Sequence, residues 1–200
     1  MRADERCGAT RDGRYRYVAV SMTQYIPIRP ARPDERALLE GLQRRASLAN
    51  PGDRDAILSN PDAIVLPPKQ IAESRVFVAE RDGVVAGFAA VLPRADDGAE
   101  LDALFVEPHL WKHGIGRRLV DHAAVVARAD GAAFLHVIGN PHAQEFYLSC
   151  GFIVTGTVET RFGIGLTMRR PLSSSRTRNG ASGRPAKYSS TALREPPHHP

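Results

Sequence analysis

The chain has 200 residues, of which 42% are hydrophobic, and a formal net charge of +5. This length suits one domain with a substantial core, and no run approaches the roughly 18 apolar residues of a membrane-spanning helix, so no integral membrane protein is expected. The basic excess lies at the ends, since residues 1–21 hold five basic and three acidic side chains and residues 173–200 hold five and one. The middle is close to neutral, which argues against a body that binds nucleic acid.

The composition divides the sequence into three parts. Residues 22–172 carry the apolar periodicity of one folded domain. Residues 1–21 have too short an apolar patch for an export signal and are expected to be a poorly ordered extension. Residues 173–200, rich in Ser, Arg, Pro and Gly, are expected to be a disordered basic tail, for which a solvated appendage is a simpler interpretation than a polyanion-binding arm. Cys7 and Cys150 are far apart, which offers no disulfide framework and predicts a cytoplasmic protein.

The first half of the domain is predicted to run from a strand through helices to antiparallel strands. Residues 25–29 alternate like a strand, and Pro33 and Asp34 open a helix with leucines at helical spacing. A second short helix (residues 51–58) and a proline-rich loop (residues 61–68) follow. Antiparallel strands are predicted at residues 76–80, 84–92 and 100–106.

The second half is predicted to contain a strand-helix-strand crossover. Residues 115–126 repeat apolar side chains on one helical face, and an Asp-Gly pair ends that helix. A buried strand (132–138), a helix (142–150) and a final strand pair (153–158 and 163–168) follow. An antiparallel front half joined to such a crossover, without an internal repeat, predicts an α+β fold in which helices cover one sheet.

A glycine-bearing loop lies between the strand that ends at Val106 and the following helix. Gly114 and Gly116 lack Cβ atoms and allow a ligand to approach the backbone closely. The first N–H groups of a helix lack partners and carry partial positive charge, so they can bind an anion such as a pyrophosphate. Arg117 and Arg118 in the first turn would add cationic donors.

A second motif follows the next apolar strand and begins at Asn140. Together with the glycine loop it resembles motifs A and B of the GNAT superfamily, the acetyl-CoA-dependent N-acetyltransferases, over roughly residues 26–172. In that family the first motif starts with Gln or Arg, whereas Trp111 stands at that position here and removes one polar side chain from the loop. The second motif matches at Asn140, Ala143, Phe146, Tyr147, Gly151 and Phe152.

The resemblance implies a fold and a cofactor site. It implies a GNAT-like mixed, largely antiparallel central sheet flanked by helices, whose motif-bearing strands splay apart and admit the pantetheine arm of acetyl-CoA. Backbone groups of Phe105 and Val106 would receive that arm, and Asn140 would bond it, cap the next helix, or do both. The implied cofactor residues are Phe105, Val106, Lys112, His113, Gly114, Ile115, Gly116, Arg117, Arg118 and Asn140.

Acetyl transfer to an amine needs a proton acceptor, a donor to the oxyanion and a proton for the leaving thiolate. Glu100 stands where several GNAT enzymes carry a general-base glutamate, and Asp102, two residues on, is expected to share its face of the strand. The alternative interpretation is that both carboxylates solvate a strand end. Tyr147 corresponds to the family's tyrosine that protonates the thiolate, although a core tyrosine with a polar tip would look similar.

Neither a metal nor a covalent acetyl-enzyme is expected. The histidines do not group with carboxylates or cysteines at ligand spacing, and His136 within an apolar strand is expected to be a buried histidine with satisfied partners. Cys150 beside Gly151 is expected to fill the core, which favours direct transfer.

Two functions from different classes remain. One is an N-acetyltransferase acting on a primary amine, favoured by Glu100 and Tyr147; the other is a non-catalytic acyl-CoA-binding protein of the same fold, motivated by Trp111. The acidic pair favours a cationic acceptor, and peptide amines, amino acids, polyamines and aminoglycosides all satisfy it. A monomer or homodimer without membrane or nucleic-acid partners is expected.

Overall fold

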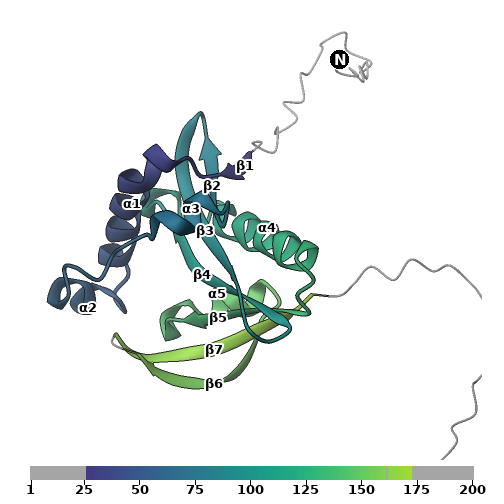
Figure 1. Cartoon of the computed structure of the whole chain (residues 1–200). Coiled ribbons are helices and arrows are strands. Elements are labelled where there is room, and N and C mark those ends of the chain that lie inside the picture. Colours follow the sequence, from purple (N-terminus) through teal and green to yellow (C-terminus); the bar gives the residue numbers. More distant parts are fainter. Residues whose placement is uncertain (1–25, 161, 173–200) are drawn as a thin grey trace, which may run out of the picture.

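Residues 26–160 and 162–172 are described by a computed structural model, and within them seven strands form one sheet (Figure 1). The spatial order is β1-β2-β3-β4-β5-β7-β6; β4 and β5 are parallel and the other neighbours antiparallel, which confirms the predicted fold class. The predictions for residues 1–21 and 173–200, and for Tyr25 in the first strand, lie outside the described residues. The strands are β1 (Ile28–Pro30), β2 (Val76–Arg81), β3 (Val84–Pro93), β4 (Gly98–Val106), β5 (Phe134–Gly139), β6 (Ile153–Thr160) and β7 (Gly163–Pro171).

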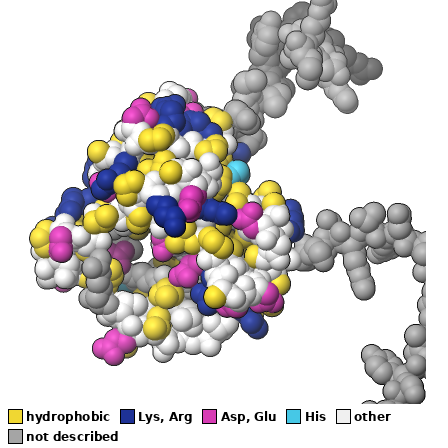
Figure 2. Space-filling view, viewed as in Figure 1, with side chains coloured by type: hydrophobic (Ala, Val, Ile, Leu, Met, Phe, Trp, Pro, Cys, Tyr) yellow, Lys and Arg dark blue, Asp and Glu magenta, His cyan; other side chains and the backbone are white. Residues whose placement is uncertain are grey.

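Helices cover both faces of this sheet, and α1 and α4 lie on opposite sides of it (Figure 1). Charged side chains of both signs are interspersed on the face seen in Figure 2, in keeping with the nearly neutral middle of the sequence. No helix in the described part of the chain is long and apolar enough to cross a membrane. The helices are α1 (Arg36–Ala49), α2 (Arg54–Ser59), α3 (Pro68–Ala72), α4 (Ile115–Ala129) and α5 (Gln144–Ser149).

The apolar face predicted for α4 is confirmed. Ile115, Leu119 and Ala123 are buried in a core between this helix and the sheet, while Val126 lies half-buried at its margin. Gly131, with a φ of +89°, follows the helix, where a left-handed residue allows the chain to turn back.

The short helix α3 begins at the last proline of the stretch predicted to be a loop. Proline suits a first helical turn, because its missing N–H has no helical partner there. Ile71 of α3 is buried in the second core, on the α1 side of the sheet. This single helical turn buries one side chain, and it is too short to show an apolar repeat in the sequence.

A β-bulge interrupts β4 at Asp102. Val91 of β3 pairs with Leu101, and the preceding Ala90 pairs with Ala103, so Asp102 is an extra residue without a partner on β3. Side chains alternate between the two faces of a strand, so after one extra residue each side chain lies on the face opposite to the one that uninterrupted alternation would give. Leu101 packs in the α4 core before the bulge and Leu104 after it, whereas Ala103 packs on the α1 side.

Strands β4 and β5 pair at their beginnings, from Gly98↔Phe134 to Glu100↔His136. Beyond Glu100 no further pair joins β4 to β5 along their described lengths, so the two strands separate toward their carboxyl ends. The chain leaves this separated end of β4 into the glycine loop.

Candidate active site

The glycine loop ends in a left-handed residue at the start of α4. Gly114 has a φ of +80°, and a Cβ built there would meet nothing within 4 Å. The first helical hydrogen bond of α4 runs from the N–H of Arg118 to the carbonyl of Gly114, so the three preceding N–H groups have no helical partner. Backbone donors and the helix dipole therefore face an open space at this point.

Gly116 has a different reason to lack a side chain. A Cβ there would lie 3.2 Å from the ring of Phe146 on α5, so this glycine lets α4 and α5 approach closely. Of the two loop glycines, Gly114 is the one that borders free space.

The basic side chains of the loop also differ in their surroundings. The guanidinium of Arg117 donates to the carbonyl of Ser149 at 2.8 Å and to its hydroxyl at 3.0 Å, which directs it to the end of α5 and leaves it less suited to the predicted phosphate contact. Arg118 is half-buried, and its side chain makes no hydrogen bond or ion pair with any described residue. Lys112 and His113 are exposed, and His113 Nδ1 lies 3.0 Å from the carbonyl oxygen of Trp111.

The backbone of β4 offers one edge to the cleft between β4 and β5. The N–H of Glu107 donates to the carbonyl of Ala86 in β3, and backbone groups point alternately to opposite edges of a strand. Phe105, two residues earlier, therefore directs its N–H and C=O toward β3, and Val106 directs its own toward the cleft. Of the two residues predicted to receive the pantetheine arm, Val106 has the suitable orientation.

The side chain of Trp111 already forms a hydrogen bond with one of these backbone groups. Its indole Nε1 donates to the carbonyl of Val106 at 2.8 Å, and the side chain is 39% exposed. The sequence located Trp111 as a departure from the family motif but gave no sign of this contact.

Glu100 lies on the opposite face of the sheet from α4. Its neighbours Ala99 and Leu101 point into the α4 core, so its carboxylate points to the other side. There it is paired with Arg94 at 3.2 Å and lines a pocket of about 270 Å³. The pocket residues are Arg94, Glu100, His136, Val137, Ile138, Thr155, Thr167 and Met168.

Asp102 does not join Glu100 in that pocket. It is exposed, and its carboxylate accepts a 3.2 Å hydrogen bond from the side chain of Gln70 on α3. Gln70 lies on the α1 side of the sheet, so Asp102 faces away from α4 as Glu100 does. It contacts α3 and lies outside the pocket, however, so the two carboxylates have different surroundings. The geometry favours Glu100 as the carboxylate available to a substrate.

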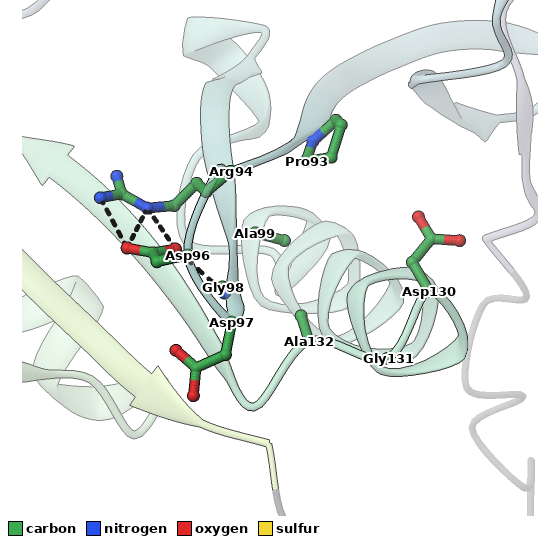
Figure 3. Close-up of a pocket in the computed structure, with 9 residues that line it drawn as sticks. All are labelled: Pro93, Arg94, Asp96, Asp97, Gly98, Ala99, Asp130, Gly131 and Ala132. Atoms are coloured by element: carbon green, nitrogen blue, oxygen red, sulfur yellow. Dashed lines mark hydrogen bonds and ion pairs between the residues drawn. The ribbon is translucent and has the colours of Figure 1, made fainter.

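A smaller pocket of about 140 Å³ lies at the other end of β4 from the glycine loop. Figure 3 shows Arg94 paired with Asp96 at its rim, while Asp97 and Asp130 point away from each other. Arg94 lowers the pKa of the Asp96 carboxyl. Arg94 thus bridges Asp96 and Glu100 and ties this turn to the larger pocket.

Tyr147 lies on α5 and packs against the carboxyl end of β5. Its ring packs against Gly139, where a Cβ would lie 2.9 Å from a ring carbon, and meets the edges of Phe146 and Phe152. Burial raises the pKa of the Tyr147 hydroxyl, with smaller effects from Cys150 and Asp53. The phenol consequently stays protonated at physiological pH and is a hydrogen-bond donor.

Asn140 caps the turn that leads into α5 and also binds the α1–α2 loop. Its Oδ1 accepts from the N–H of His142 at 2.9 Å, and its Nδ2 donates to Asp53. The loop approaches so closely that a Cβ on Gly52 would clash with the side chains of Asn140 and His142. The capping alternative for Asn140 is therefore confirmed, while its contact with pantetheine stays a prediction.

The remaining histidines and the cysteine show no such assembly. Within the described residues, no group of three His, Cys, Asp or Glu side chains could hold a metal ion. His136 was predicted to be buried, but it is half-buried and lines the Glu100 pocket, because β5 has helices on one face alone at this position. Burial raises the pKa of the Cys150 thiol, which disfavours the thiolate that a covalent mechanism needs.

Comparisons with known proteins agree with this geometry. An uncharacterized N-acetyltransferase of Mycobacterium tuberculosis is 30% identical over 92 residues, or 44% of this chain and 58% of that protein. A peptidyl-lysine N-acetyltransferase of Salmonella typhimurium is 40% identical over 62 residues, or 31% of this chain and 41% of that protein. The chain thus spans less than two thirds of the length of these relatives.

Solved structures share the fold. The PaiA N-acetyltransferase from Thermoplasma acidophilum, in complex with coenzyme A, has a TM-score of 0.61 at 19% identity and covers 74% of this chain and 99% of its own. A GCN5-related N-acetyltransferase from Rhodopseudomonas palustris has a TM-score of 0.59 at 24% identity, covering 74% and 96%. A model of the acetyltransferase (GNAT) family matches residues 49–152, and the chain belongs to that family.

Proposed function

We propose that the protein transfers the acetyl group of acetyl-CoA to a primary amine by direct attack. The observation that carries this proposal is the separation of β4 from β5 directly before the glycine loop. The unpaired N–H groups at the start of α4 suit a pyrophosphate, and the backbone of Val106 suits the pantetheine arm. Membership of the family and the coenzyme A bound in the Thermoplasma structure support acetyl-CoA as the co-substrate.

In the proposed reaction the amine nitrogen forms a bond to the thioester carbon, and the N–H of Val106 stabilises the oxyanion. As the intermediate collapses, the attacking nitrogen loses its second proton to water and the carbon–sulfur bond breaks. The thiolate takes a proton from Tyr147, which regains one from solvent. Glu100 accepts the proton of the ammonium group, directly or through water. The buried, protonated state of Tyr147 and the open pocket around Glu100 support these separate roles.

The surroundings of Glu100 support a polar, cationic acceptor. A substrate ammonium could replace Arg94 as the partner of Glu100, and the hydroxyls of Thr155 and Thr167 line the same pocket. The Salmonella relative acts on peptidyl-lysine, so lysine side chains belong among the acceptors to be tested.

A panel of lysine peptides, amino acids, polyamines and aminoglycosides, assayed with acetyl-CoA for release of the CoA thiol, tests this function. Release that depends on one class of amine is expected, and mass spectrometry of the acceptor should show one added acetyl group. Tight CoA binding without turnover on any class would favour the alternative, a non-catalytic acyl-CoA-binding protein. Trp111, which stands where the family carries Gln or Arg, is the observation that motivates that alternative.

A further inference from the structure

The side chain of Trp111 lies on the edge of the cleft that the pantetheine arm would enter. Its indole N–H donates to the carbonyl of Val106, whose backbone points away from β3 because Glu107 bonds to that neighbour instead. A chain added to this strand edge would need the carbonyl of Val106 as an acceptor, and the indole already bonds to it.

The indole and an added chain compete for the same position. An amide chain that extends a sheet places its N–H groups about 2.9 Å from the carbonyl oxygens of the strand edge. The indole nitrogen is already 2.8 Å from the oxygen of Val106. A carbonyl oxygen can accept two hydrogen bonds, but a ring that donates from this side lies where an added chain would run.

The segment that carries Trp111 has the properties of a part that can move. The indole is partly exposed, and the next residue, Lys112, has a φ of +66°, which is unfavourable for a residue other than glycine. Gly114 has open space around its Cα. Departure of the indole therefore requires no rearrangement of the core.

We infer that Trp111 is a gate residue of the cofactor cleft: its indole closes the Val106 carbonyl in the free protein, and the pantetheine arm displaces it. This inference rests on the proposed acetyl-CoA site. It makes the affinity for CoA depend on a competition within the protein, so removing the indole N–H should strengthen binding of ligands that have a pantetheine arm. Ligands that lack this arm should be unaffected.

Calorimetric titration of wild type and Trp111→Phe with CoA and with 3′,5′-ADP separates these cases, because 3′,5′-ADP has no pantetheine arm. The variant keeps an aromatic ring and loses the donor. CoA should bind about threefold to tenfold more tightly, the range of one hydrogen bond, while the affinity for 3′,5′-ADP stays unchanged. Unchanged or weaker CoA binding, or an equal change for both ligands, would contradict the gate.

The intrinsic fluorescence of wild type gives a second measurement that needs no variant. Trp111 is the single tryptophan of the chain, so its emission should shift to longer wavelength on saturation with CoA and keep its wavelength with 3′,5′-ADP. Emission that does not change at saturating CoA would disprove the gate while leaving the cofactor site intact. Failure of both ligands to bind wild type would instead remove the proposed function, and the gate with it.

Discussion

The two edges of β4 differ in how completely they are paired. Toward β3 the pairing extends over the strand, from Gly87↔Val106 to Pro93↔Ala99. Toward β5 it stops at Glu100↔His136, and the backbone beyond is left to the cleft. One edge joins β4 to the sheet, and the other leaves hydrogen-bonding groups for a ligand.

The same contrast extends to the side chains around each edge. In the fully paired half of the sheet, Arg29 on β1 bonds Glu35 at 2.7 Å and Glu80 on β2 at 2.6 Å, so its charge is satisfied within the protein. At the cleft, the side chain of Arg118 has no hydrogen-bond or ion-pair partner among the described residues, and Glu100, although paired with Arg94, faces a pocket. Changes in the paired half should therefore reduce stability, and changes at the cleft should reduce binding or turnover.

The largest effect is expected from Gly114→Val. A valine there would place its side chain in the open space at the start of α4, where the pyrophosphate is proposed to lie, and CoA binding should fall by at least about a hundredfold. Calorimetry with CoA measures this. Gly83→Val is the matched control, because Gly83 also has a positive φ, +78°, and open space but lies in the β2–β3 turn. Equal loss in both variants would attribute the effect to strain.

Tyr147→Phe should lower kcat by roughly a hundredfold, within the range of general-acid catalysis, and leave CoA affinity nearly unchanged. The phenylalanine ring keeps the packing against Gly139 and loses the hydroxyl. Rates with a good acceptor, under conditions where chemistry limits turnover, decide the matter. Wild-type turnover in the variant would leave water or the acceptor as the source of the proton.

Glu100→Gln should lower the rate by about tenfold to a hundredfold at neutral pH. Its defect should shrink in alkaline buffer, because a growing fraction of the amine is then already deprotonated, whereas the defect of Tyr147→Phe should persist. Asp102→Gln, which alters the carboxylate outside the pocket, is the control and should change the rate little. A larger defect in Asp102→Gln than in Glu100→Gln would reverse the assignment of the base.

Glu35→Gln tests the paired half of the sheet and should cost about 2 kcal/mol of unfolding free energy. Arg29 lowers the pKa of Glu35 from 4.5 to about 2. Because the folded pKa is the lower one, the stabilisation is present above about pH 4.5 and is lost as the pH falls toward 2. Thermal melting across this range should show a steeper acid loss for wild type than for the variant. Glu73→Gln, at an exposed pair with Lys69, should cost little.

The smallest effect is expected from truncation to residues 22–172. The two removed segments contain few large apolar side chains, so they should add little to the melting temperature or to CoA affinity. A fall of many degrees in the truncated protein would show that one end contributes to the fold.

Local patterns in the sequence predicted most elements of the fold. Apolar runs bounded by turn residues located β2, β3 and β4, and the 3.6-residue repeat located α4, because these signals arise within each element. The two motifs located Gly114 and Tyr147 in the same way.

Contacts between distant segments could not be predicted. Arg117 and Ser149 are 32 residues apart, and Asp53 and Asn140 are 87 residues apart, so no local spacing relates them. No glycine in the sequence marks the bulge at Asp102. The bulge is defined by the pairing of β4 with β3, which local sequence patterns do not specify.

The gap between β4 and β5 has a further consequence for the order of events. The helix α4 and the glycine loop serve one face of the sheet, whereas the pocket of Glu100 opens on the other. A closed sheet would keep two reactants on these faces apart, but separated strands let them meet through the sheet. Under the proposed chemistry, acetyl-CoA and the amine thus enter and their products leave by separate routes, so both substrates can be bound together before either product departs.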